Sequence, residues 1–185
     1  MLSSEPVLVR VRVDGKFFRL GKEKFYAKGV TYGPFAPNTQ GEHFPELPQT
    51  RLDFAQLREL GANLLRVYDV PPRWFLDLAI QSGLRLLVDV PWNKHLCFLD
   101  SEEKRQEIRT LVRAAATACA RHPAVFAISV VNELPADIVR WSGAANIARF
   151  IDELAAIVRE VDPECLCTFG NYPPTEFLRP REIYF

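Results

Sequence analysis

The chain has 185 residues, of which 48% are hydrophobic and 25% charged, so it can bury one sizeable core and is too apolar to be disordered. Lysine plus arginine and aspartate plus glutamate both number 23, and this balance gives no field that would recruit nucleic acid or an anionic membrane. No apolar run approaches the roughly 20 residues that cross a bilayer, and no signal region is visible, so we expect no membrane contact by this segment and a cytoplasmic location.

The N-terminal segment alternates apolar and polar residues from Val7 to Leu20 around the turn-forming pair Asp14-Gly15. This pattern predicts a β-hairpin, after which Gly21-Lys22 turns the chain again. We therefore divide the chain into a hairpin over residues 1–24, packed on the main fold, and a main domain over residues 25–185.

In the main domain, strand-like apolar runs alternate with segments of helical period. The runs are Phe25 to Thr31, Asn63 to Tyr68, Leu84 to Val90, Val125 to Val131 and Leu166 to Phe169. Strands that are apolar on both faces and separated by helices predict a parallel sheet covered by helices.

Four helices are predicted between these runs. The first starts at Thr50, which forms a capping box with Asp53, and the second opens at Pro72. The other two carry apolar stripes: Ile108, Leu111, Val112, Ala115 and Cys119 in the third, which begins near Asp100, and Ile147 to Val161 in the fourth. We expect Trp74 and Trp141 to pack in the helix layer.

Two architectures fit this order of elements. An open doubly wound sheet usually binds a nucleotide through a glycine-rich first turn, whereas the loop from Thr31 to Pro37 has no such motif and contains two prolines. We therefore favour a (β/α) TIM barrel, incomplete at about five of the eight β/α units, because a full barrel needs about 250 residues.

In a barrel the residues that follow each strand meet at one rim. These residues are Thr31 and Tyr32; Arg66 and Tyr68; Asp89, Trp92, Asn93 and His95; Asn132 and Glu133; Asn171 and Tyr172. Aromatic faces stack on sugar rings, and amides, carboxylates and guanidinium groups bind hydroxyls, so the set favours a neutral carbohydrate substrate. Arg66 equally fits a buried ion pair with Asp69 or Asp89, Tyr32 and Tyr172 fit packing as well as binding, and we assign His95 a structural role.

The four cysteines, Cys97, Cys119, Cys165 and Cys167, are expected to be buried free thiols, since no Cys-x-x-Cys motif or histidine pair accompanies them. We therefore expect no metal and no cofactor.

The order of short motifs along the strands resembles the retaining glycoside hydrolases of the large barrel superfamily, which includes β-glucuronidases, β-galactosidases and cellulase-like enzymes. The motifs are Gly29-Val30-Thr31, Gly61-Ala62-Asn63 leading into Leu65-Arg66-Val67-Tyr68, Asp89 with Trp92, and Asn132-Glu133. The resemblance implies an O-glycosyl hydrolase that acts on a neutral β-linked carbohydrate through two carboxylates about 5 to 5.5 Å apart.

The resemblance also implies roles for particular residues. Glu133 matches the catalytic acid/base, Asn132 the residue that binds the sugar 2-hydroxyl, and Arg66 the arginine near the nucleophile. Substrate contacts are expected from Tyr68, Trp92, Tyr32, Asn171 and Tyr172. The nucleophile of that superfamily is a glutamate at the seventh strand, which has no counterpart here, so we expect a fragment that is inactive in isolation.

A narrower similarity is to the glycosidase-like region found ahead of a bacterial membrane glycosyltransferase module. It rests on Val30 to Phe35, Pro71 to Trp74 and Asn171 to Glu176. Two macromolecular partners stay open: a covalently attached glycosyltransferase module, and a second copy that pairs through the open sheet edges. The alternative function is a non-catalytic carbohydrate-binding or scaffold domain associated with that glycosyltransferase.

Overall fold

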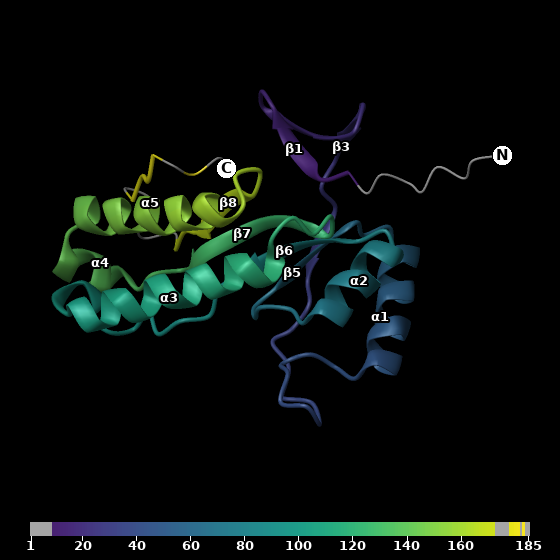
Figure 1. The fold of residues 1–185 in the computed structure, drawn as a ribbon, viewed down its shortest axis with the longest axis horizontal. Coiled ribbons are helices and arrows are strands. Elements are labelled where there is room, and N and C mark those ends of the chain that lie inside the picture. Colours follow the sequence, from purple (N-terminus) through teal and green to yellow (C-terminus); the bar gives the residue numbers. More distant parts are fainter. Residues whose placement is uncertain (1–8, 173–177, 182, 184–185) are drawn as a thin grey trace.

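A small antiparallel sheet precedes a larger parallel sheet with helices in the computed structural model, which describes residues 9–172, 178–181 and 183 (Figure 1). The antiparallel sheet has the order β1 (Val11–Asp14), β2 (Phe17–Leu20) and β3 (Glu23–Phe25). Gly15 and Gly21, with φ of 61° and 59°, adopt the left-handed conformation that the two turns require. The predicted hairpin is confirmed for its described residues; Val7 lies outside them.

The predicted strand from Phe25 to Thr31 is wrong as a single element. Phe25 pairs with Phe18 and so belongs to the small sheet, while β4 (Gly29–Thr31) starts the parallel sheet. The chain crosses between the two sheets at residues 26–28, where Tyr26 is 64% exposed.

The parallel sheet contains β4, β5 (Leu64–Val67), β6 (Arg85–Asp89), β7 (Val125–Asn132) and β8 (Leu166–Gly170), in that order. Every neighbouring pair is parallel, and the spatial order follows the chain order without a reversal. A doubly wound sheet reverses its order at a switch point, whereas a barrel does not. The topology is therefore that of a partial (β/α) barrel.

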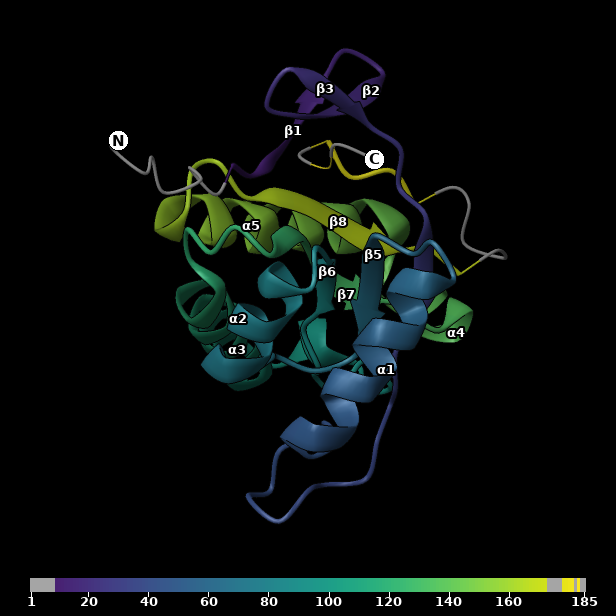
Figure 2. The same cartoon turned by 90° about the vertical axis from the view of Figure 1, so that its right-hand side faces the viewer.

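Helices follow the strands and lie around the sheet, with the antiparallel sheet set apart from them (Figures 1 and 2). They are α1 (Leu47–Glu59), α2 (Arg73–Gln81), the short 3-10 helix η1 (Phe98–Asp100), α3 (Glu102–Cys119), α4 (Ala136–Ser142) and α5 (Ala144–Val161).

The two faces of the sheet are buried by different parts of the chain. Leu65 and Val67 point toward the helices and belong to the main core, whereas Leu64 belongs to a second cluster with Val11 of β1. Phe18 of β2 packs edge-on against Phe126, with ring centroids 4.9 Å apart. Because Leu64 is the first residue of its strand, the antiparallel sheet covers the amino end of the inner face and leaves the carboxyl ends to the candidate site.

The helix predictions need three corrections. Helix α1 begins at Leu47, so the capping box at Thr50 is wrong; Thr50 is fully buried inside the helix and its hydroxyl donates to the carbonyls of Pro45 and Glu46. Leu111, expected in the apolar stripe of α3, is 39% exposed. Helix α4 was not predicted, and Trp141 at its end is 71% exposed instead of packed.

Candidate functional site

Polar side chains gather at the carboxyl ends of the middle strands. Strand register places Arg66 beside Thr31, Asp89 beside Ser129, and Asn132 beside Gly170. In a parallel sheet these ends lie on the edge where barrel enzymes carry their active sites.

Arg66 connects three strands at this edge. Its Nε donates to Asp89 Oδ2 at 2.8 Å, and its Nη2 donates to Asn132 Oδ1 at 2.7 Å. The guanidinium carbon also lies 5.2 Å from the centre of the Tyr68 ring, within the range of a cation–π interaction. Of the alternatives in the sequence, the ion pair with Asp89 is the one that forms, and it coexists with the contact to Asn132.

The side chain of Asp89 is only 4% exposed, and its carboxylate forms an ion pair with Arg66. Burial lowers the pKa of Arg66, but the hydrogen bond and charge of Asp89 raise it by more. The charges of Tyr68 and Glu133 raise it further. The pKa of Arg66 is therefore raised from its ordinary value, and the residue is a fixed cation at the strand ends.

Glu133 follows β7 with a left-handed backbone, φ 51°, which is uncommon for a residue with a Cβ atom and costs roughly 1–3 kcal/mol. Its N–H donates to the carbonyl of Gly170 at 2.8 Å, so the neighbouring strand holds this conformation. The residue is exposed, and its charge acts on Arg66. The carboxylate therefore lies beside the Arg66 cluster and is open to a ligand.

Two residues of this cluster were not predicted. Lys94, in the loop after β6, donates to the carbonyl of Asn132, the residue before Glu133, and so brings a second cation to the end of β7. Gly170 approaches Asn132 so closely that a Cβ atom there would lie 2.5 Å from Asn132 Oδ1 and 3.3 Å from Arg66 Nη2. A glycine directly after the last predicted strand is the feature of the sequence that could have indicated this close approach.

Four of the remaining predicted site residues directly follow strands or lie close to strand ends. Tyr68 and Trp92 lie at the strand ends and are half-buried; the Trp92 indole donates to the Val130 carbonyl at 2.8 Å and packs edge-on against Phe98. Asn171 and Tyr172 directly follow β8 and are exposed. The stretch from residue 173 to 176, which carried part of the narrower resemblance, lies outside the described residues.

The structure does not bring the side chain of Tyr32 to this cluster, although its backbone N–H donates to the Arg66 carbonyl at 2.8 Å. Thr31 is in register with Arg66, and Tyr32, the next residue, is 8% exposed and packs with Phe54 and Phe75 in the core shared with α1 and α2. Its hydroxyl donates to Asp53 Oδ2 at 2.6 Å. Tyr32 therefore packs the sheet against the helices.

Cys97 is exposed, which corrects the expectation of four buried thiols. Burial raises the pKa of Cys119 and Cys167 to about 12 and that of Cys165 to about 11, so these thiols stay protonated. Within the part of the chain that the structure describes, no cluster of histidine, cysteine or acidic residues could hold a metal ion. None of the helices in the same part is long and apolar enough to cross a membrane.

Comparison with known proteins finds sequence relatives over part of the chain. The chain is 35% identical over 89 residues to the 1,3-beta-glucanosyltransferase gel1 of Aspergillus fumigatus, a match that covers 46% of this chain and 20% of that protein. The chain thus spans about a fifth of this relative. No family model matches the chain.

Solved structures match over most of the chain. The beta-mannanase of the blue mussel Mytilus edulis has a TM-score of 0.64 at 18% identity and matches 89% of this chain and 64% of that one. The GH2 beta-galacturonidase of Eisenbergiella tayi has a TM-score of 0.69 at 19% identity and matches 88% of this chain and 28% of that one.

These likenesses confirm the predicted fold. The chain has the fold of part of a (β/α) barrel, like the solved mannanase and galacturonidase structures that it matches.

Proposed function

We propose that this chain forms the acid/base half of a retaining glycosidase site that acts on a neutral β-linked polysaccharide. In this proposal Glu133 is the general acid/base, Asn132 binds the sugar, and Arg66 holds Asn132 in place. The nucleophilic carboxylate comes from a part of the protein outside the described residues.

The observation that carries the proposal is the bond between Arg66 and Asn132. A guanidinium group only donates hydrogen bonds, so the Asn132 atom at 2.7 Å must be the amide oxygen. The amide NH₂ group of Asn132 can then donate a hydrogen bond to a sugar hydroxyl oxygen. The adjacent Glu133 supplies the carboxylate, and its backbone is fixed by Gly170.

The chemistry requires Glu133 to cycle between two protonation states. As the bond from the anomeric carbon to the leaving oxygen breaks, Glu133 gives its proton to that oxygen and the nucleophile bonds to the anomeric carbon. Glu133, now ionised, then takes a proton from the incoming acceptor, which attacks the anomeric carbon and releases the nucleophile. A water acceptor gives hydrolysis, and a sugar hydroxyl gives transfer.

The nature of the relatives sets the order in which substrates are tested. The matched fungal protein is named for 1,3-beta-glucan transfer, and several structural neighbours are mannanases. We therefore propose β-1,3-glucan as the first candidate and β-1,4-mannan as the second.

Azide rescue tests the role of Glu133 in a protein that contains both this chain and the proposed nucleophile. Glu133→Ala should lose most turnover of glycans, because the leaving oxygen is no longer protonated. With an aryl β-glycoside, whose leaving group needs no acid, added azide should restore turnover and give the β-glycosyl azide. Absence of rescue, or an α-configured product, would refute a retaining acid/base role. The matched control is Glu103→Ala, which changes an exposed glutamate on α3 and should leave turnover unaffected.

A second candidate is a non-catalytic carbohydrate-binding or scaffold domain for an attached glycosyltransferase. Its supporting observation is that the described sheet has five strands, whereas the implied nucleophile belongs to a seventh. If the extended protein binds glycans without turnover, and Glu133→Gln binds them as tightly as the unchanged chain, this candidate replaces the first. Self-association through the edge strands β4 and β8 remains an accompanying proposal, which sedimentation measurements can test.

A further inference from the structure

Trp141 is a large aromatic side chain in an unusual position. It ends helix α4 and is 71% exposed, whereas Trp74 and Trp92 are half-buried. Its indole N–H donates to Asp100 Oδ2 at 2.7 Å, so the exposed ring is held in one orientation. An indole that is both solvent-exposed and fixed offers a flat apolar surface at little further entropic cost to a ligand.

The ring lies at the side of a groove of about 650 Å³ between η1, α3, α4 and α5. The groove, here called the Trp141 groove, is lined by Asp100, Arg105, Trp141, Asn146, Arg149 and Glu153, among others. Helix α3 contributes side chains from residues 102–109 and α5 from residues 146–153, the parts nearer their N-termini, which in a (β/α) barrel lie toward the carboxyl ends of the strands. The groove therefore lies toward the same end of the fold as Glu133.

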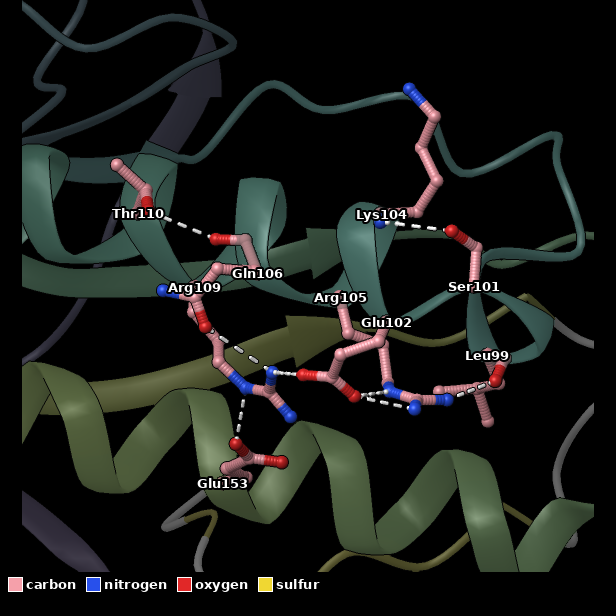
Figure 3. Close-up of polar contacts among 9 residues, drawn as sticks. All are labelled: Leu99, Ser101, Glu102, Lys104, Arg105, Gln106, Arg109, Thr110 and Glu153. Carbon is pink, nitrogen blue, oxygen red and sulfur yellow. Dashed lines mark hydrogen bonds and ion pairs between the residues drawn. The ribbon is translucent and has the colours of Figure 1, made fainter.

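The charges that line the groove balance and are mostly satisfied within it. Three carboxylates, of Asp100, Glu102 and Glu153, face three guanidinium groups, of Arg105, Arg109 and Arg149. Figure 3 shows Glu102 between Arg105 and Arg109, and Arg109 reaching across to Glu153 of α5. The Arg109 Nη1 to Glu102 Oε1 distance is 2.6 Å, and the Arg109 Nε to Glu153 Oε1 distance is 2.5 Å.

This balance selects the class of ligand. The three carboxylates and three guanidinium groups cancel one another, so the groove offers no net charge to an anion or a cation. Paired carboxylates and guanidinium groups still have lone pairs and N–H bonds that can serve hydroxyl groups. The ion pairs by themselves explain how α3 is joined to α5, but they do not explain a fixed, exposed indole beside them.

We propose that the Trp141 groove is a second carbohydrate-binding site, which stacks a sugar ring of a neutral polysaccharide on Trp141 and binds its hydroxyls with the flanking polar side chains. The proposal rests on residues of η1, α3, α4 and α5 and needs neither Glu133 nor a nucleophile. It would anchor a polysaccharide at a place separate from the strand-end cluster.

NMR titration of the chain with β-1,3-glucan or β-1,4-mannan hexasaccharide tests this site, because the three tryptophan indole N–H signals report separately. Saturable shifts of the Trp141 indole by one of the two hexasaccharides are expected. Trp141→Ala should weaken binding of that oligosaccharide about tenfold in the same titration, followed at neighbouring backbone amides, because the flat apolar surface that stacks the sugar ring is lost. Trp141→Tyr should retain most of the affinity, and Trp74→Phe is the control.

Two results would overturn the proposal: no shift of the Trp141 indole with either hexasaccharide, or the same affinity for Trp141→Ala and the unchanged chain. Melting temperatures show whether each variant is folded. We expect the Trp141 variants to fold normally, because this side chain is largely exposed. Asn132→Ala should leave the Trp141 shifts unchanged, so loss of the strand-end site and loss of the groove are measured independently.

Discussion

At the scale of single residues, the candidate site depends on a glycine as much as on charged groups. Arg66 and Asn132 meet above Gly170, whose hydrogen leaves the space that their hydrogen bond occupies. The same glycine accepts the Glu133 N–H through its carbonyl. Position 170 thus leaves room for the Arg66–Asn132 bond and, through its backbone carbonyl, binds the backbone of the candidate acid/base.

Gly170→Ala should therefore disrupt the Arg66–Asn132 bond, since the new Cβ would lie 2.5 Å from Asn132 Oδ1. Hydrogen bonds to charged groups contribute about 1.5–3 kcal/mol, and we expect a loss of that order in the free energy of unfolding, measured in urea. Gly29→Ala is the control, because its Cβ would meet no atom within 3.6 Å. Equal stabilities of the two variants would contradict this account.

At the scale of elements, a buried histidine joins α2 to the turn between α3 and β7. His122 is 3% exposed; its Nδ1 accepts the Ala124 N–H, so its Nε2 carries the proton and donates to Asp77 at 3.0 Å. Burial lowers the pKa of His122 below its ordinary 6.5, and the Asp77 carboxylate only partly offsets that effect. The neutral imidazole is therefore part of the fold.

This shift makes stability depend on pH in a defined direction. As the pH falls, the unfolded chain binds a proton at His122 near pH 6.5, whereas the folded chain binds it only at a lower pH. The stability that His122 contributes is therefore complete above pH 6.5 and declines as the pH falls below it. The slope is at most about 1.4 kcal/mol per pH unit.

Urea unfolding between pH 7.5 and 5 measures this slope. His122→Asn can still accept the Ala124 N–H but does not titrate, so its slope should be shallower. His95→Asn, at an exposed site, should keep the slope of the unchanged chain. An identical slope for His122→Asn would show that other groups cause the dependence.

At the scale of the whole molecule, the antiparallel sheet closes the end of the parallel sheet opposite the candidate site. Val11 and Phe18 bury Leu64, Phe126 and Leu166, which would otherwise line an open inner face. Arg10 Nη1 also reaches Asp162 Oδ2 at 2.6 Å, and both side chains are largely buried. The two sheets therefore share one apolar cluster and should unfold together.

Phe18→Ala should lower the free energy of unfolding of the whole chain by about 3 kcal/mol, the lower end of the usual cost of removing a packed phenylalanine, because the ring is half-buried. Phe17, its neighbour on the other face of β2, is 43% exposed, so Phe17→Ala should cost less than about 1 kcal/mol. Calorimetry should show one transition for both variants. Similar losses, or a separate early transition for Phe18→Ala, would show that the sheets are independent.

The type and order of most elements follow from the sequence, because hydrophobic period and turn residues act over a few positions. The apolar runs became β5 to β8, and Asn132-Glu133 was recognised at the end of one of them. Helix α4 escaped prediction because its seven residues are too short to show a helical period.

Which side chains contact one another depends on the tertiary structure. Arg66 pairs with Asp89 and Asn132 because adjacent strands bring their ends into register, and no local pattern distinguishes Asp89 from Asp69. Tyr32 faces the helices because side chains alternate along a strand, so a boundary uncertain by one residue leaves its face undetermined. The close approach at Gly170 and the exposure of Trp141 likewise arise from packing between segments distant in the chain.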